Sequence, residues 1–175
     1  MSSVRPKPHD RSRAVGVVGL GKMGSQIARH LIARGMPVTG FDVRIEALED
    51  LVSQGGEAAS SPAALAARVD VIITSLPSHA ALAAVISGFD GLLAGGLPGL
   101  TVIETSTLTR AMKRPFHDDL EAAGIVMLDC PLSGTAAQLA ERDVAVYASG
   151  DSKRAAVGRS TRQTVFPLAL SMRKR

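Results

Sequence analysis

The chain has 175 residues, of which 46% are hydrophobic and 3% aromatic, and it carries a formal net charge of +4. One cysteine excludes an intramolecular disulfide and a cluster of thiolate metal ligands, and the few aromatic residues argue against platforms on which nucleic-acid bases stack. The basic charge belongs to the two ends, because residues 14–151 hold nine basic and fifteen acidic residues, so we expect no nucleic-acid partner.

The sequence also indicates where the protein resides. Residues 1–13 lack the apolar segment of a secretory signal, and the chain has no run of roughly 18 apolar residues that could span a membrane. The lone Cys130 is typical of a reducing compartment. We therefore expect a cytoplasmic protein that has no membrane partner.

Short apolar runs alternate with helical patterns through the middle of the chain, which is typical of βαβ units around a parallel sheet. The first run, Ala14–Gly19, predicts a strand. Lys22–Arg34 predicts a helix with one apolar stripe, and Gly35 ends this helix. Further strands are predicted at Pro37–Asp42, Glu57–Ala59, Val69–Ser75, Leu100–Glu104 and Ile125–Asp129. Further helices are predicted at Ile45–Ser53, after the Ser61–Pro62 start signal, at Ala80–Ile86 and at Thr109–Ala123.

The end of the chain differs in character from the middle. Val144–Ala148 predicts one more strand, which we expect to be antiparallel because the preceding loop is too short for a parallel crossover. Beyond Gly150 the periodicity is weak and the charge is basic. The sequence thus predicts a flexible N-terminal arm at 1–13, one folded domain at 14–150, and a basic tail at 151–175 that is either helical or disordered.

A glycine turn joins the first predicted strand to the first helix. Gly19, Gly21 and Gly24 have the GxGxxG spacing that allows a tight turn, close approach of a pyrophosphate, and close helix–strand packing. Asp42 ends the second strand, about 20 residues on, where a ribose-binding carboxylate is needed. The alternative is a purely steric turn, since glycines gather at turns in any case. We favour dinucleotide binding on an α/β, doubly wound, mostly parallel Rossmann sheet with helices on both faces.

Asp42 also bears on which dinucleotide binds. A carboxylate accepts hydrogen bonds from the adenosine ribose hydroxyls and repels a 2′-phosphate. Arg44 could instead meet that phosphate, or it could be a solvated residue at the start of a helix. We expect NAD as the cofactor, with NADP less favoured.

Five ordered motifs carry a family resemblance: GLGKMG at 19–24, FDVR at 41–44, SLP at 75–77, ETSTLT at 104–109 and DCPLSGT at 129–135. With these motifs, residues 14–150 resemble the β-hydroxyacid dehydrogenases, the relatives of 3-hydroxyisobutyrate and 6-phosphogluconate dehydrogenases. The resemblance implies an NAD(P)-binding domain, and hydride transfer between a hydroxyacid and NAD with a lysine as general acid and base.

The resemblance also implies roles for individual residues. Leu76 and Pro77 would line the cofactor groove, and Ser106 and Thr107 would lie near the nicotinamide ribose. Ser133 and Gly134 would hold the substrate carboxylate. The implied cofactor residues are Gly19, Leu20, Gly21, Lys22, Met23, Gly24, Asp42, Arg44, Leu76, Pro77, Ser106 and Thr107. Without the resemblance, Ser106–Thr107 is only a helix cap and residues 131–134 only a turn.

The sequence departs from the family pattern at two places. Thr135 stands where the family has a second glycine after Ser-Gly. The family's helix with the catalytic lysine, and its C-terminal all-α domain, have no match after Gly150, so neither Lys153 nor Lys174 is assigned a catalytic role. The alternative function is therefore a cofactor-binding fragment or pseudoenzyme, and an uncovered apolar edge near 125–132 would favour self-association.

Other chemistries fit the sequence less well. No GxSxG motif occurs, which argues against a serine hydrolase of that type. His9, His30, His79 and His117 show no pair at metal-ligand spacing, so we expect no metal site. Cys130 is most simply a small buried apolar residue.

Overall fold

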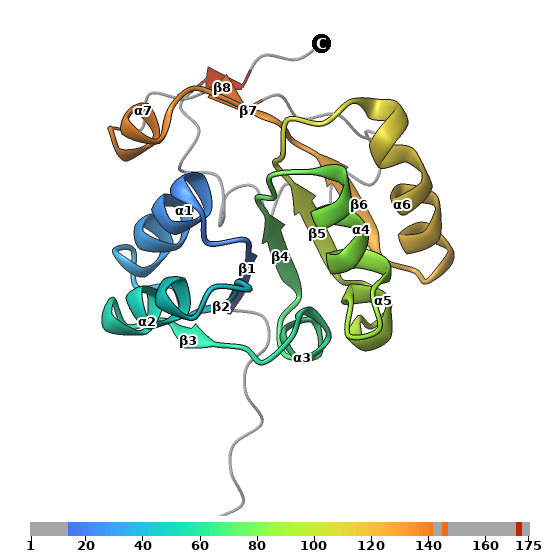
Figure 1. Ribbon diagram of the computed structural model, residues 1–175, viewed down its shortest axis with the longest axis horizontal. Coiled ribbons are helices and arrows are strands. Elements are labelled where there is room, and N and C mark those ends of the chain that lie inside the picture. The colour runs from blue at the N-terminus through green and yellow to red at the C-terminus, as the bar shows by residue number, and fades with distance from the viewer. Residues whose placement is uncertain (1–13, 142–144, 147–170, 173–175) are drawn as a thin grey trace, which may run out of the picture.

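The computed structural model describes residues 14–141, 145–146 and 171–172. Its main feature is a six-stranded sheet, entirely parallel, in the order β3-β2-β1-β4-β5-β6 (Figure 1). The strands are β1 (Val15–Val18), β2 (Val38–Phe41), β3 (Glu57–Ala58), β4 (Val71–Thr74), β5 (Thr101–Glu104) and β6 (Val126–Asp129). The predicted parallel sheet is confirmed, and this strand order is that of the Rossmann fold.

Helices cover both faces of the sheet, as predicted. They are α1 (Lys22–Ile32), α2 (Ile45–Ser53), α3 (Pro62–Ala66), α4 (His79–Ser87), α5 (Leu92–Gly95), α6 (Arg110–Ala122) and α7 (Ala136–Ala140). In Figure 1, α1 and α2 lie on the left of the sheet, and α4, α5 and α6 lie on the right. The short helices α5 and α7 were not predicted, because four or five residues are too few to show a helical period.

Local signals in the sequence start these helices. The side chains of Ser61, Ser78 and Thr109 each accept a hydrogen bond from the backbone N–H three residues on, at the N-termini of α3, α4 and α6. Such caps satisfy backbone donors that the first helical turn leaves unpaired. Helix α1 ends two residues earlier than predicted, and Gly35 (φ 75°) follows it in the left-handed conformation.

The hydrophobic core is divided by the sheet into two clusters. Residues of β1 alternate between them: Val15 and Val17 pack on the side of α1, α2 and α7, whereas Val18 packs on the side of α3, α4, α5 and α6. Buried leucines complete each side, such as Leu31 of α1 on the first and Leu82 of α4 on the second. This alternation follows from the two-residue period of a strand covered on both faces.

A second, smaller sheet has the order β7-β8-β9, formed by Leu132–Ser133, Ala145–Val146 and Ser171–Met172. The predicted antiparallel strand near Val144–Ala148 is confirmed, since β8 pairs antiparallel with β7. It does not extend the main sheet, however, and β7 replaces the turn that the residues alone suggested at 131–134. β9 lies within the tail predicted to be helical or disordered, and pairs parallel with β8.

The N-terminal arm at 1–13, residues 142–144 and 147–150, and the tail apart from β9 (151–170 and 173–175) lie outside the described residues. Among the helices of the described part of the chain, none combines the length and apolar character needed to cross a membrane.

Candidate cofactor site

The predicted cofactor residues lie at the carboxyl ends of β1, β2, β4 and β5, around the point between β1 and β4 where the strand order reverses. The chain winds outward from β1 to β3 and then returns to place β4 on the other side of β1. Backbone hydrogen bonds continue the ladder past the strands: Gly19 N–H donates to Phe41 O at 2.9 Å, and Ser75 N–H donates to Val18 O at 2.9 Å. Such a switch point is where ligands bind in open α/β sheets.

Two of the three glycines in the turn are required by the packing of the chain itself. Gly19 has a φ of 86°, and a Cβ there would collide with the carbonyl oxygen of Ser75. A Cβ on Gly24 would collide with the carbonyl oxygen of Gly19. The predicted tight turn and close helix–strand packing are therefore both present.

Gly21 is different, because nothing in the described chain would meet its Cβ. No heavy atom lies within 4 Å of that position, and the φ of −68° suits any residue. Gly21 is the N-cap of α1, and no side chain caps that helix end. The backbone donors of the first turn and the positive end of the helix dipole are thus open toward an anion.

The side chains of the turn have different surroundings. Lys22 is exposed, whereas the side chains of Leu20 and Met23 pack into the core cluster of α1. The Leu20 backbone is also occupied, because its N–H donates to Asp42 Oδ2 at 2.7 Å. Leu20 and Met23 therefore anchor the glycine turn to the hydrophobic core.

Asp42 and Arg44 form an ion pair at the end of β2. Arg44 Nε lies 3.1 Å from Asp42 Oδ1, and the two side chains are 56% and 9% exposed. Arg44 Nη2 also donates to Leu20 O at 3.2 Å. Burial raises the pKa of Asp42, but hydrogen bonds from the Arg44 side chain and from the Arg44 and Leu20 backbones outweigh it, so the pKa lies below its ordinary value.

Ser106 joins the loops that follow β4 and β5. Its Oγ accepts a hydrogen bond from the Leu76 N–H at 2.8 Å, and its side chain is buried. Pro77 and Thr107, the neighbours of this pair along the chain, are exposed. The structure therefore brings Leu76 and Ser106 into direct contact and leaves the next residue of each loop at the surface.

The predicted substrate residues lie in the small sheet. Ser133 belongs to β7 and pairs with Ala145 of β8, and Gly134 follows it with a φ of 145°. Both residues are exposed. Figure 1 shows β7 and α7 beyond the carboxyl ends of the main sheet, and Leu139 of α7 packs in the core cluster of α1.

Three charged residues near this edge were missed by the sequence analysis. Lys113 Nζ of α6 lies 2.7 Å from Glu104 Oε2 and 2.6 Å from Asp129 Oδ1. The signal was available, because β5 and β6 each end in an acidic residue and Lys113 occupies the apolar stripe of α6 with Phe116 and Leu120. We call Glu104, Lys113 and Asp129 the buried charge cluster.

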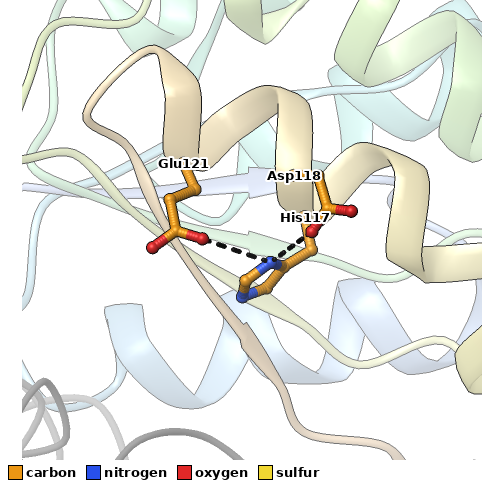
Figure 2. A group of neighbouring side chains, drawn as sticks. All are labelled: His117, Asp118 and Glu121. Atoms are coloured by element: carbon orange, nitrogen blue, oxygen red, sulfur yellow. Dashed lines mark hydrogen bonds and ion pairs between the residues drawn. The ribbon is translucent and has the colours of Figure 1, made fainter.

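A second group of titratable side chains lies on the outer surface of α6. His117, Asp118 and Glu121 present ligand atoms within 4.8 Å of one another, and His117 Nδ1 lies 3.4 Å from Asp118 Oδ1 (Figure 2). All three residues are exposed and come from one helix. Exposed acidic groups commonly have this geometry without a metal, so the expectation of no metal site stays a prediction.

Comparison with known proteins agrees with this geometry. Residues 14–160 match the family described as the NAD binding domain of 6-phosphogluconate dehydrogenase. The L-threonate dehydrogenase of Cupriavidus necator is 35% identical over 142 residues, which are 81% of this chain and 48% of that protein. The chain thus spans about half the length of this curated relative.

Two solved structures extend the comparison. The Mycobacterium tuberculosis 3-hydroxyisobutyrate dehydrogenase with L-serine superimposes with a TM-score of 0.82 at 28% identity, over 93% of this chain and 54% of that one. The structure of Psf3 in complex with NADP+ and 2-OPP has a TM-score of 0.83 at 27% identity, over 92% of this chain and 56% of that one. The likeness therefore covers the described fold and about half of each larger protein.

Proposed function

This chain belongs to the family of the NAD binding domain of 6-phosphogluconate dehydrogenase, and from that membership we propose that it is the cofactor half of an NAD-linked hydroxyacid dehydrogenase. The matched region begins at residue 14, where we place the start of the cofactor domain, and we place its end near residue 150. The basic tail beyond is not assigned a role in cofactor binding.

The observation that carries the proposal is the open N-terminus of α1 at the switch point. Packing within the chain explains Gly19 and Gly24 but gives no reason for a glycine at Gly21. A dinucleotide supplies that reason, because its pyrophosphate must approach the backbone closely and accept hydrogen bonds from the first helical turn. Asp42, which follows β2, then stands beside the adenosine ribose.

We propose NAD rather than NADP as the preferred cofactor. The Asp42 carboxylate is fixed by the Leu20 N–H and by Arg44, and its lowered pKa keeps it ionised at neutral pH. A fixed negative charge repels a ribose 2′-phosphate. The Arg44 guanidinium is engaged with Asp42, so it offers less of its charge to a phosphate than a free arginine would. NADP remains the alternative that the titration below distinguishes.

The Gly21 position provides the test of cofactor binding. We expect Gly21→Asn to leave the melting temperature unchanged or higher, because the side chain has open space and asparagine is a good N-cap. NADH binding, followed by fluorescence titration, should weaken by about tenfold or more, since the side chain occupies the place of the pyrophosphate. Gly21→Asp should weaken it further because it adds a negative charge. Unchanged NADH affinity in both variants would contradict the proposed site.

For the substrate we propose a hydroxyacid whose carboxylate is held by Ser133 and Gly134. Both residues are exposed in the described structure, so the substrate side of the site is open to water. This exposure favours the second candidate function for the 175-residue chain by itself, a cofactor-binding module without turnover, because catalysis depends on fixed substrate orientation.

An assay distinguishes the two candidates. The 175-residue chain is mixed with NAD and a panel of 3-hydroxyisobutyrate, glycerate, threonate and 6-phosphogluconate, and NADH is followed by absorbance. We expect NADH to bind in titration and no hydroxyacid-dependent NADH production above background. Turnover with any member of the panel, abolished by Gly21→Asp, would show that this chain performs hydride transfer unaided.

A further inference from the structure

The buried charge cluster joins three elements beneath the carboxyl edge of the sheet. Glu104 ends β5, Asp129 ends the neighbouring strand β6, and Lys113 comes from the second turn of α6. The side chains of Glu104 and Lys113 are 0% and 3% exposed, and that of Asp129 is 31% exposed. One ammonium group therefore lies between two carboxylates, mostly out of water.

The register of the sheet explains why the two carboxylates meet. Glu104 and Asp129 are directly paired positions of the parallel strands β5 and β6. Helix α6 connects these strands and packs against them, with Lys113 on the same buried stripe as Phe116 and Leu120. Burial lowers the pKa of the Lys113 ammonium, but hydrogen bonds to Asp129 and Glu104 outweigh it, so the pKa lies above its ordinary value.

Stability alone does not account for a charged cluster at this place. A buried ion pair is often no more stabilising than apolar side chains of similar volume, because desolvation offsets the attraction between the charges. Lys113 also makes a contact that a methionine could not make, since its Nζ donates to the backbone carbonyl of Ser106 at 2.6 Å. Lys113 is thereby tied to the segment that follows β5.

Ser106 is held at three of its atoms. Its carbonyl oxygen accepts from Lys113 Nζ, its N–H donates to both carboxylate oxygens of Glu104 at 3.1 Å, and its Oγ accepts from the Leu76 N–H at 2.8 Å. The buried charge cluster thus fixes the Ser106 backbone, and Ser106 in turn fixes the backbone of the loop after β4. Both loops lie at the edge where the cofactor is proposed to bind.

We propose that Lys113 is a positioning residue for the cofactor: held between Glu104 and Asp129, it fixes Ser106, and through Ser106 the Leu76 loop, on the nicotinamide side of the site. This inference rests on the proposed function. The adenosine side depends on Asp42 and the glycine turn instead, so the two sides of the cofactor respond to different residues.

The main variant is the double substitution Glu104→Gln with Lys113→Met. It removes the ammonium and one carboxylate together, leaves an amide oxygen able to accept from the Ser106 N–H, and avoids stranding the Glu104 carboxylate unpaired in the core. The matched control is Arg68→Met, which removes a cation from an exposed ion pair with Glu57. Arg68 precedes β4, so it lies at the amino edge of the sheet, away from the proposed site.

Two readouts are measured on the full chain. The first needs no ligand: hydrogen exchange of the Leu76 N–H by NMR should accelerate about tenfold or more in the double variant, because Ser106 no longer holds it. The second compares NADH with ADP-ribose, which has the adenosine side but no nicotinamide. The NADH dissociation constant should rise about fivefold, and that of ADP-ribose should change less than about twofold.

Each outcome decides the proposal. Arg68→Met should leave both readouts unchanged, and Ser106→Ala should reproduce the faster Leu76 exchange and the selective loss of NADH affinity. Unchanged Leu76 exchange in the double variant would overturn the positioning role. Faster exchange with parallel loss of NADH and ADP-ribose would overturn the nicotinamide-side assignment and indicate a general structural role. If the starting chain binds neither ligand, the proposed function fails, and the Leu76 exchange still decides whether Lys113 positions the loop.

Discussion

The two charge clusters at the carboxyl edge of the sheet differ in how far their cations are exposed to water. The Asp42–Arg44 pair, at the end of β2, has a half-exposed guanidinium and lies where a ligand can reach it. The buried charge cluster, at the ends of β5 and β6, has its ammonium almost entirely enclosed. Exposed ion pairs contribute little to stability, whereas removing one partner of a buried pair is strongly destabilising. This difference agrees with the roles proposed above, ligand selection for the first cluster and positioning of the backbone for the second.

The largest effect that this comparison predicts is on stability. Lys113→Met by itself should lower the free energy of unfolding by about 3–5 kcal/mol, because it leaves Glu104 buried without its counter-charge. Urea unfolding measures this directly. The double variant with Glu104→Gln should recover most of the loss, and Arg68→Met should stay within about 0.5 kcal/mol of the starting protein. A loss for Lys113→Met as small as that for Arg68→Met would remove the distinction between the two clusters.

An intermediate effect is predicted on cofactor selection. Asp42→Asn should weaken NADH binding roughly tenfold, since a hydrogen bond to a charged acceptor is lost, and should narrow the difference between NADH and NADPH. Fluorescence titration with both cofactors measures the change. Arg44→Ala is the matched comparison, and it should leave the order of the two affinities as it was. Equal affinity for NADH and NADPH in the starting protein would mean that Arg44, and not Asp42, governs the pocket.

The smallest effect is predicted at the extremes of pH. The Asp42–Arg44 pair should lose its contribution to stability at low pH, and the buried charge cluster should lose its contribution at high pH. The pKa of Asp42 is lowered from 3.8, so its contribution to stability is complete above that pH and is lost as the pH falls through the folded-state pKa. The pKa of Lys113 is raised from 10.5, so its contribution is complete below that pH and is lost as the pH rises through the folded-state pKa. Melting temperatures measured across acid and alkaline buffers give the loss of stability at each end of the pH range, the acid limb and the alkaline limb of the profile.

Two variants test which cluster causes the loss of stability at each end of the profile of melting temperature against pH. Asp42→Asn should flatten only the acid limb, and the Glu104→Gln, Lys113→Met double variant should flatten the alkaline limb. A double variant that keeps the alkaline limb of the starting protein would show that Lys113 does not control stability there.

The comparison of predicted and observed strands and helices shows what local sequence patterns can and cannot predict. The strands of the parallel sheet and the longer helices were predicted within a few residues. Short apolar runs mark most of the strands, and a repeated apolar period marks the longer helices. The short helix α5 was not predicted, because its four residues are too few to show a helical period. The strand near Val144–Ala148 was predicted with the right orientation, but its place in a separate sheet depends on pairing with β7, which no local signal encodes.

The sequence by itself determined the glycine turn, the acidic residue at the end of the second strand, and the succession of main-sheet strands and longer helices along the chain. These features depend on residues that are close along the chain, so spacing and period are enough to predict them. Only the tertiary structure decided that a Cβ at Gly21 would meet open space and that Lys113 lies between Glu104 and Asp129. Those contacts depend on the register of two parallel strands and on the face that α6 turns toward them, which are set by packing across the whole sheet.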